Sequence, residues 1–169
     1  LGRGLAAAAG GAGRVVLIGG EPGIGKTRLA EAFAADLDGA RVLWGRCHET
    51  EGAPPFWPWR EVLRALGADL DPDLLRAVAG LDAAVLAEVV PELAAVLGAR
   101  PADGETARFH FFDVVTRLLV RASADCPLVV VVEDLHWGDE PTLALLRFVV
   151  NGMRGSGVLL VATYRTVGV

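Results

Sequence analysis

Short apolar runs in this chain alternate with longer stretches in which apolar residues recur at helical spacing. The apolar runs are rich in valine, isoleucine and leucine, which is typical of strands that a parallel sheet buries on both faces. They predict strands over residues 14–19, 41–44, 128–132 and 158–162. We expect the first of these strands to be covered on both faces of the sheet.

Helical spacing marks the segments between these strands. After the first strand it predicts a helix over residues 26–37. Prolines divide the long interval between the second and third strands into short helices, expected over residues 59–66, 73–79, 82–89 and 91–97, before a longer helix over 105–122. The longer helix carries an apolar stripe that we expect to pack against the sheet, formed by Phe111, Val115, Leu118 and Ala122. The pattern predicts one α/β domain over residues 1–169, with a helical insert at about residues 54–104.

Composition and charge argue against a nucleic-acid-binding segment, a zinc or disulfide framework and a membrane span. The chain has 169 residues and a net charge of −5, and its arginines are scattered, so no basic surface for nucleic acid is expected in this segment. Cys47 and Cys126 are too few and too far apart for a zinc site or a disulfide framework, so we expect free thiols in a reducing compartment, the cytoplasm. No apolar run reaches the roughly 18 residues of a membrane span. Because the first residue is Leu1, we expect the chain to be a segment of a longer protein.

The residues between the first strand and the first helix fit the phosphate-binding pattern G-x-x-x-x-G-K-[ST]. The lysine of the pattern is Lys26, the only lysine in the chain. A compact, flexible ammonium reaches the β and γ phosphates, whereas a planar guanidinium is too wide. The helix that follows offers free N–H groups to phosphate. We therefore expect a nucleotide phosphate site at Gly20, Glu21, Pro22, Gly23, Ile24, Gly25, Lys26, Thr27 and Arg28. The Ala/Gly-rich residues 1–14 lead directly into this loop's strand, which argues against a signal peptide.

Two carboxylates follow the valines of the third predicted strand. Glu133 and Asp134 come at its C-terminal end, the edge of a parallel sheet where ligands bind. Beside a phosphate loop this is a Walker B arrangement, in which one acid holds Mg²⁺ together with the Thr27 hydroxyl and the other polarises the attacking water. By position, Glu133 faces Mg²⁺ and Asp134 orients the water. The usual order is aspartate before glutamate, so chemical identity exchanges the two roles, and both assignments stay open.

Four segments together resemble the ATPase domain of large bacterial signal-transduction regulators. They are GEPGIGKTRL from Gly20, WGRC from Trp44, PPFWPW from Pro54 and EDLHWGD from Glu133. The resemblance extends over essentially the whole chain and is to the STAND-like, Orc-like AAA ATPase modules of LuxR-type (LAL) transcriptional activators and related signalling ATPases. It implies a three-layer P-loop NTPase fold of the ASCE/AAA type and ATP with Mg²⁺ as cofactors. It also implies a switch whose nucleotide state controls assembly and an attached output domain.

The resemblance implies further details. The second strand should lie beside the third and the first near the fourth, with a final strand and a lid beyond Val169. The Thr163-Tyr164-Arg165 segment after the fourth strand resembles the sensor-1 motif, in which Arg165 reads the γ-phosphate. The alternative is that Arg165 caps the sheet edge or pairs with a surface acid. Expected partners are ATP, sensor and output domains of the same parent chain, and a second copy on ATP binding, but neither nucleic acid nor a membrane.

Three functions remain compatible with the sequence. The first is a slow, regulated ATPase that acts as a switch. The second is a non-hydrolysing ATP-binding scaffold, which the order of Glu133 and Asp134 favours. The third is a small-molecule kinase, which the paired acids and Arg165 disfavour because they suit water activation and phosphate sensing. Two nearby features are expected to be structural: His136 in a packed, hydrogen-bonded turn rather than as a catalytic base, and Asp139 as the cap of the next helix.

Overall fold

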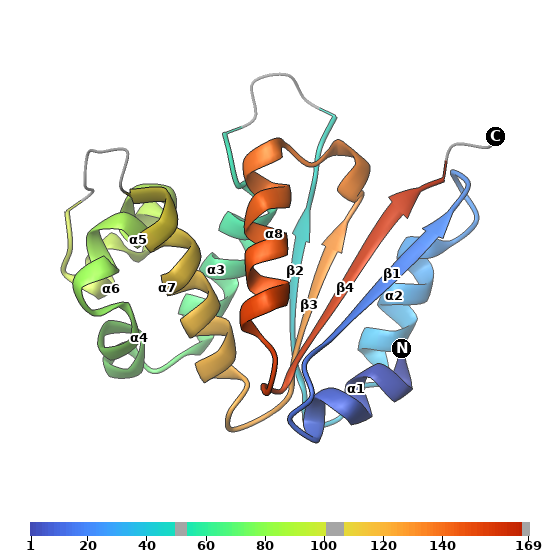
Figure 1. The fold of residues 1–169 in the computed structure, drawn as a ribbon, viewed down its shortest axis with the longest axis horizontal. Helices are drawn as coiled ribbons and strands as arrows, with labels where there is room; N and C mark the ends of the chain where they lie inside the picture. Colours follow the sequence, from blue (N-terminus) through green and yellow to red (C-terminus); the bar gives the residue numbers. More distant parts are fainter. Residues whose placement is uncertain (50–53, 101–106, 167–169) are drawn as a thin grey trace.

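Four parallel strands form one sheet within residues 1–49, 54–100 and 107–166, which the computed structural model describes (Figure 1). The strands are β1 (Arg14–Gly20), β2 (Arg41–Arg46), β3 (Leu128–Glu133) and β4 (Val158–Arg165). Their order is β1-β4-β3-β2, which confirms both expected neighbour pairs. Residues 163–165 were expected to follow the fourth strand, but they form its C-terminal end because β4 stays paired with β1 as far as Arg165.

Helices occupy the segments that helical spacing predicts, and one more follows the cap expected at Asp139. They are α2 (Lys26–Ala35), α3 (Trp57–Asp69), α4 (Pro72–Ala79), α5 (Ala83–Val89), α6 (Ala94–Leu97), α7 (Ala107–Ala122) and α8 (Glu140–Gly152). Three 3₁₀ turns connect them, η1 (Gly80–Asp82), η2 (Pro91–Leu93) and η3 (Leu135–Trp137). The predicted helix over 91–97 is therefore a 3₁₀ turn followed by α6. Residues 101–104 of the predicted insert and 105–106 of the predicted long helix lie outside the described residues.

One helix was not predicted. α1 (Gly2–Ala9) has no capping side chain and consists largely of alanine and glycine, so the sequence carries no start signal for it. Packing explains the helix, because Ala8 is fully buried and Leu1 and Leu5 contact the same apolar cluster on the sheet.

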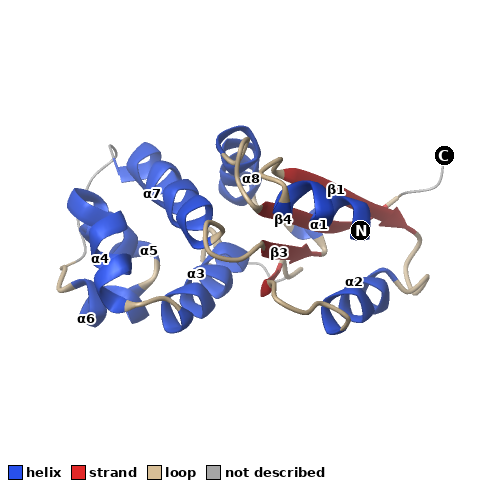
Figure 2. Ribbon diagram, turned by 90° about the horizontal axis from the view of Figure 1, so that it is seen from below, coloured by secondary structure: helices blue, strands red, loops and turns tan. Residues whose placement is uncertain are grey.

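Helices cover the sheet on two sides (Figure 2). On one side lie α1 and α2, over a cluster that includes alternate residues of β3 and β4 (Val129, Val131, Leu159, Val161). On the other side lie α8 and α3, with α7 and the remaining insert helices beyond them (Figure 1). The stripe predicted on α7 is buried in the apolar cluster that also holds the opposite residues of β3. β3 is one of the two inner strands, so its residues alternate between the two clusters and every one of them is buried.

The first strand is not covered on both faces, contrary to expectation. Val15 is 36% exposed and Leu17 is 58% exposed. The cause is the position of β1 in the sheet, because among the described residues it pairs only with β4. Val16 and Ile18 face α1 and α2, whereas no described helix covers the side chains of Val15 and Leu17.

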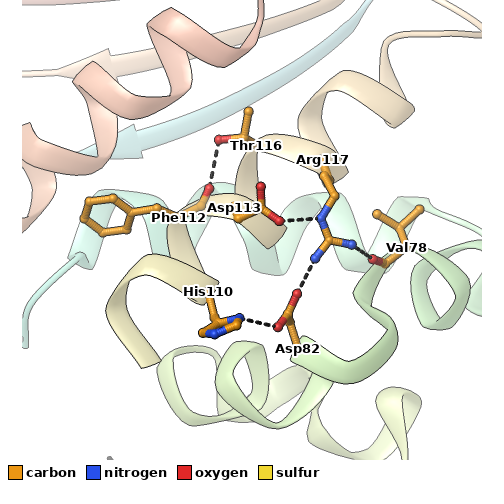
Figure 3. A network of polar contacts seen from close by, with 7 residues as sticks. All are labelled: Val78, Asp82, His110, Phe112, Asp113, Thr116 and Arg117. Carbon is orange, nitrogen blue, oxygen red and sulfur yellow. Dashed lines mark hydrogen bonds and ion pairs between the residues drawn. The ribbon is translucent and has the colours of Figure 1, made fainter. Parts of the chain in front are cut away.

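A polar network holds the insert to the long helix α7 (Figure 3). Arg117 of α7 donates to the Asp113 carboxylate at 2.8 Å and to the Val78 carbonyl of α4 at 2.5 Å. It also pairs with Asp82 of η1, whose other carboxylate oxygen lies 3.0 Å from Nδ1 of His110. One arginine therefore joins α7, α4 and η1.

The helix α3 lies against the backbone of β2. A Cβ atom on Gly45 would lie 2.2 Å from the carbonyl oxygen of Pro58, so only glycine fits there. Trp59 is fully buried, and its Nε1–H donates to the Thr142 carbonyl of α8 at 3.2 Å. The aromatic residues of the PPFWPW segment therefore anchor α3 to the core.

We predict that Gly45→Ala lowers the free energy of unfolding by about 1–3 kcal/mol, the usual cost of overpacking. The contact is with backbone atoms, which cannot rotate away as a flexible side chain can. Urea unfolding measures the effect, and Gly2→Ala is the matched control because a Cβ there meets nothing within 4 Å. Equal stability of the two variants would contradict the close approach of α3.

Candidate functional site

The predicted phosphate loop turns from β1 into α2 through two glycines with left-handed backbone. Gly23 has φ 78° and Gly25 has φ 100°, conformations that residues with a Cβ rarely adopt. Gly25 is the N-cap of α2 and supplies no side-chain cap, so the first N–H groups of the helix stay open to a ligand. The loop is therefore shaped to offer backbone donors to an anion.

Lys26 folds back over this loop. Its Nζ donates to the carbonyl oxygens of Gly20 and Glu21, each at 2.9 Å. Both acceptors are neutral oxygens, which bind an ammonium more weakly than phosphate oxygens do. The loop thus holds the lysine at the mouth of α2 and leaves it free to exchange these carbonyls for phosphate.

A pocket of about 660 Å³ opens at the N-terminus of α2. Its walls come from the loop and α2 on one side and from the ends of β3 and β4 on the other, and they comprise Pro22, Gly23, Gly25, Lys26, Thr27, Arg28, Glu31, Ala32, Ala35, Asp134 and Arg165. The structure therefore brings the predicted loop together with Asp134 and Arg165. The other predicted residues, Gly20, Glu21, Ile24 and Glu133, do not line this pocket.

Asp134 lines the pocket from a left-handed backbone conformation. Its φ is 54°, a left-handed conformation that ends β3 and starts η3. Its N–H donates to Oγ1 of the fully buried Thr163 at 3.0 Å. The tie to β4 fixes the direction in which the chain leaves the sheet, and Asp134 lines the same pocket as Lys26 and Thr27.

Glu133 lies in a different environment. It is only 4% exposed, and its Oε2 accepts hydrogen bonds from Nη2 and Nε of Arg46 at 2.5 and 3.1 Å. The bond and the negative charge of Glu133 raise the pKa of Arg46 above its ordinary value. The other oxygen, Oε1, is buried without a hydrogen-bond partner among the described residues. One half of this carboxylate is therefore neutralised and the other half is left for a ligand.

The sequence analysis assigned no role to Arg46, although it lies in the WGRC segment. The signal that would have found it is strand register. β2 and β3 are parallel neighbours, and Arg46 is directly opposite Glu133 at their C-terminal ends. A basic residue that ends one strand and an acid that ends its neighbour are expected to meet, once the pairing of the strands is predicted.

We predict that Arg46→Gln lowers the free energy of unfolding by about 1–3 kcal/mol, because it leaves a buried carboxylate without its charged partner. The double variant Arg46→Gln/Glu133→Gln should recover most of this loss. Arg64→Gln is the control, since Arg64 pairs with Glu92 where both side chains are exposed and such pairs contribute about 0–1 kcal/mol. A double variant no more stable than Arg46→Gln would contradict the assignment.

The turn that follows the two acids is packed against β4. Trp137 stacks near His136 at a ring distance of 5.0 Å, and the guanidinium of Arg165 lies 5.7 Å from the Trp137 ring centroid. Asp139 caps α8 as expected, accepting from the Thr142 N–H at 2.6 Å. The expected hydrogen bond of His136 is absent: both ring nitrogens are buried with no partner in the described part of the chain. The backbone hydrogen bonds of Trp137 and Gly138 and the packing of its rings therefore hold the turn.

Neither cysteine forms a disulfide, which confirms the expectation of free thiols. Cys47 follows Arg46 and is buried, and burial, with the charges of Asp139 and Asp134, raises the pKa of its thiol to about 12. The thiol stays protonated at neutral pH and adds no charge beside the acids.

No helix in the described ranges has the length and apolar character needed to cross a membrane.

Comparison with known proteins identifies the family. The sequence profile of the AAA ATPase domain matches residues 3–161. No curated protein matches the chain. Similar solved structures include PCH-2 of C. elegans, at 15% identity and a TM-score of 0.40 over 90% of this chain and 30% of that one. They also include Drosophila ORC bound to GC-rich DNA and Cdc6, at 11% identity and a TM-score of 0.45 over 98% of this chain and 45% of that one. The chain thus spans less than half the length of either.

The arrangement of sheet, loop and helices is that of a P-loop NTPase, as the sequence analysis expected. Membership of the matched family implies nucleotide binding, for which AAA domains generally use ATP with Mg²⁺. With the profile covering residues 3–161 of 169, the chain belongs to the AAA ATPase domain family.

Proposed function

We propose that this chain is a Mg²⁺-dependent ATPase module that acts as a nucleotide-controlled switch. The observation that carries the proposal is the pocket at the N-terminus of α2, which Lys26, Thr27, Asp134 and Arg165 line together. The Lys26 ammonium and the open amides of α2 can bind phosphate groups. The Asp134 carboxylate can orient a water molecule, and the Arg165 guanidinium can bind a γ-phosphate. The proposed ligand is therefore a nucleoside triphosphate, and the family favours ATP.

Two groups support a magnesium ion at this pocket. Thr27 lines the pocket and offers a hydroxyl; Glu133 precedes the pocket-lining Asp134 without lining the pocket itself, and its buried Oε1 lacks a partner among the described residues. No group of three or more His, Cys, Asp or Glu side chains forms a metal site in the described ranges, so the ion would complete its shell with phosphate oxygens and water. When bound, Mg²⁺ neutralises charge on the β and γ phosphates. We assign Thr27 and Glu133 to hold it.

Asp134 and Arg165 are then left for the chemistry at the γ-phosphate. Asp134 lines the pocket opposite Lys26, which supports its assignment as the residue that orients the attacking water. Arg165 lines the same pocket from the end of β4, which supports its assignment as the sensor of the γ-phosphate. Lys26 neutralises the β and γ charges from the side of the loop.

A switch needs a path from the pocket to other parts of the protein. Asp139, just after the η3 turn, accepts from the Phe56 N–H at 3.3 Å, and Phe56 is the residue from which α3 starts. Arg46 connects Glu133 to the same helix, because its own N–H donates to Glu61 of α3 at 2.8 Å. Glu133 is thus connected to the helical insert through Arg46, and the segment after η3 is connected to it through Asp139. We propose that this module serves a larger, cytoplasmic bacterial signalling or transcription-regulatory protein of the LuxR type, in which ATP binding drives contacts with its sensor and output domains or a second copy.

One observation favours a second candidate, the ATP-binding scaffold without turnover. Arg46 already occupies one oxygen of Glu133, at 2.5 Å, and a carboxylate so held is a weaker metal ligand. Nucleotide would then stabilise the fold or an interface without being hydrolysed.

The experiment that separates the two is Mg·ATP binding by calorimetry and single-turnover hydrolysis on the wild-type full-length protein. Binding with hydrolysis supports the switch, and binding without hydrolysis supports the scaffold. Absence of binding in the presence of Mg²⁺ would overturn both.

A further inference from the structure

The side chain of Arg165 joins the phosphate pocket to the η3 turn. Arg165 lines the pocket, but Trp137 does not. The guanidinium carbon of Arg165 lies over the Trp137 ring, 5.7 Å from the ring centroid. Residues two apart on a strand share a face, so Arg165 lies on the same face as Val161, which packs in the cluster beneath α1 and α2. The phosphate loop opens on that face. The indole therefore contacts the arginine from outside the pocket.

The contact leaves the hydrogen-bonding capacity of Arg165 intact. A guanidinium is planar, stacking through its faces and donating through its edges. In the described ranges the side chain of Arg165 makes no hydrogen bond or ion pair, whereas Arg46 donates from both Nε and Nη2 to Glu133. Arg165 can accordingly stay against the indole while its N–H groups bind phosphate oxygens.

The backbone that carries the Trp137 ring is tied to β4, the strand that carries Arg165. The backbone N–H of Trp137 donates to the Asp134 carbonyl at 2.9 Å, and the backbone N–H of Asp134 donates to Thr163 Oγ1 at 3.0 Å. Thr163 is fully buried on β4, so its hydroxyl is held in place by the sheet. The backbone of Trp137 is therefore fixed relative to β4, and its partly buried ring packs against the apolar core.

We propose that Trp137 is a positioning residue for Arg165. The indole holds the exposed guanidinium at the rim of the pocket, so that its donors meet the γ-phosphate instead of extending into solvent. The inference rests on the proposed function, because it requires ATP to occupy the pocket. Its consequence is that preference for ATP over ADP depends on a ring that does not line the nucleotide site.

The test compares the affinities of Mg²⁺ complexes of ADP and of the non-hydrolysable imido analogue of ATP, by calorimetry on the full-length protein. Trp137→Leu should lower the preference for the analogue about two- to fivefold, the strength of an exposed cation–π contact, with the affinity for ADP unchanged. Arg165→Gln should lower the preference at least as much. In the double variant, Trp137→Leu should add nothing to the effect of Arg165→Gln. Trp57→Leu is the matched control, since Arg60 lies 5.5 Å from that ring but neither residue lines the pocket.

The outcomes are separable. The inference is overturned if Trp137→Leu keeps the wild-type preference for the analogue over ADP. It is also overturned if Trp137→Leu lowers this preference further in the Arg165→Gln background. In both cases the proposed function stands. Trp137→Phe keeps a smaller aromatic face, so its preference for the analogue over ADP should lie between those of wild type and Trp137→Leu. If the leucine variant does not fold, a wild-type preference in Trp137→Phe overturns the inference. If the wild-type protein and Lys26→Ala bind the analogue equally or not at all, the proposed function fails and the inference fails with it.

Discussion

Replacement of Lys26 by alanine is expected to weaken Mg·ATP binding by roughly 30- to 5,000-fold, because loss of one partner of a close charge pair costs about 2–5 kcal/mol. The physical reason is specific to this site, since Lys26 is the only lysine in the chain and lines the pocket beside the open amides of α2. Stability should change little, because the two bonds of Nζ go to carbonyls of the loop and one of them is exposed. Calorimetry with ATP and urea unfolding measure the two quantities on the same samples.

Two comparisons sharpen this prediction. Lys26→Arg keeps the positive charge but should not restore binding, because a guanidinium is too wide for the curled loop. Arg121→Ala removes a basic residue that pairs with Asp125 and does not line the pocket, and it should bind like wild type. If Lys26→Arg restored wild-type affinity, the pocket would be a general anion site and not a P-loop site.

Asp134→Asn is expected to bind ATP within a few-fold of wild type and to hydrolyse it on the order of 10²- to 10⁴-fold more slowly, the usual contribution of a positioned base. Asparagine is the appropriate replacement because Asp134 has φ 54°, and asparagine is among the few residues that tolerate this conformation. The backbone N–H that bonds Thr163 is retained. Single-turnover hydrolysis at saturating ATP measures the rate without the contribution of product release.

Glu133→Gln distinguishes the two assignments of the acids. If Glu133 holds the metal, this variant should require a higher concentration of Mg²⁺ for the same rate, while Asp134→Asn should not. If instead Asp134→Asn shifts the Mg²⁺ requirement and Glu133→Gln stops hydrolysis without shifting it, the roles are exchanged. Glutamine can still accept the hydrogen bonds of Arg46, so the comparison is not confounded by a lost contact.

The strands and the helix after the phosphate loop could be predicted because their signals are local. Valine runs fix β3, and the spacing of apolar residues fixes α2 and α7. α1 could not be predicted, since alanine and glycine carry no periodic pattern and the helix depends on burial of Ala8 against the sheet. The exposure of Leu17 was missed for a related reason: an edge strand and a central strand can have the same apolar sequence, and only the strand order separates them.

The residues of the candidate site also fall into those that local sequence signals predict and those that depend on the tertiary structure. The loop was predicted from a pattern within a few consecutive residues, and its pairing with Asp134 follows from the rule that parallel strands end at one edge. The ion pair of Arg46 with Glu133 joins residues 87 positions apart, and its existence depends on register between β2 and β3. The contact of Arg165 with Trp137 depends on the path of a turn whose backbone starts in a left-handed conformation, which a sequence pattern does not specify.

The exposed side of β1 has a consequence for how such a protein is handled in solution. Val15 and Leu17 form an apolar strip on a strand whose outer edge has no partner among the described residues. An unpaired apolar edge is a template for strand addition by another molecule. Residues 1–169 are therefore prone to edge-to-edge self-association at high protein concentration.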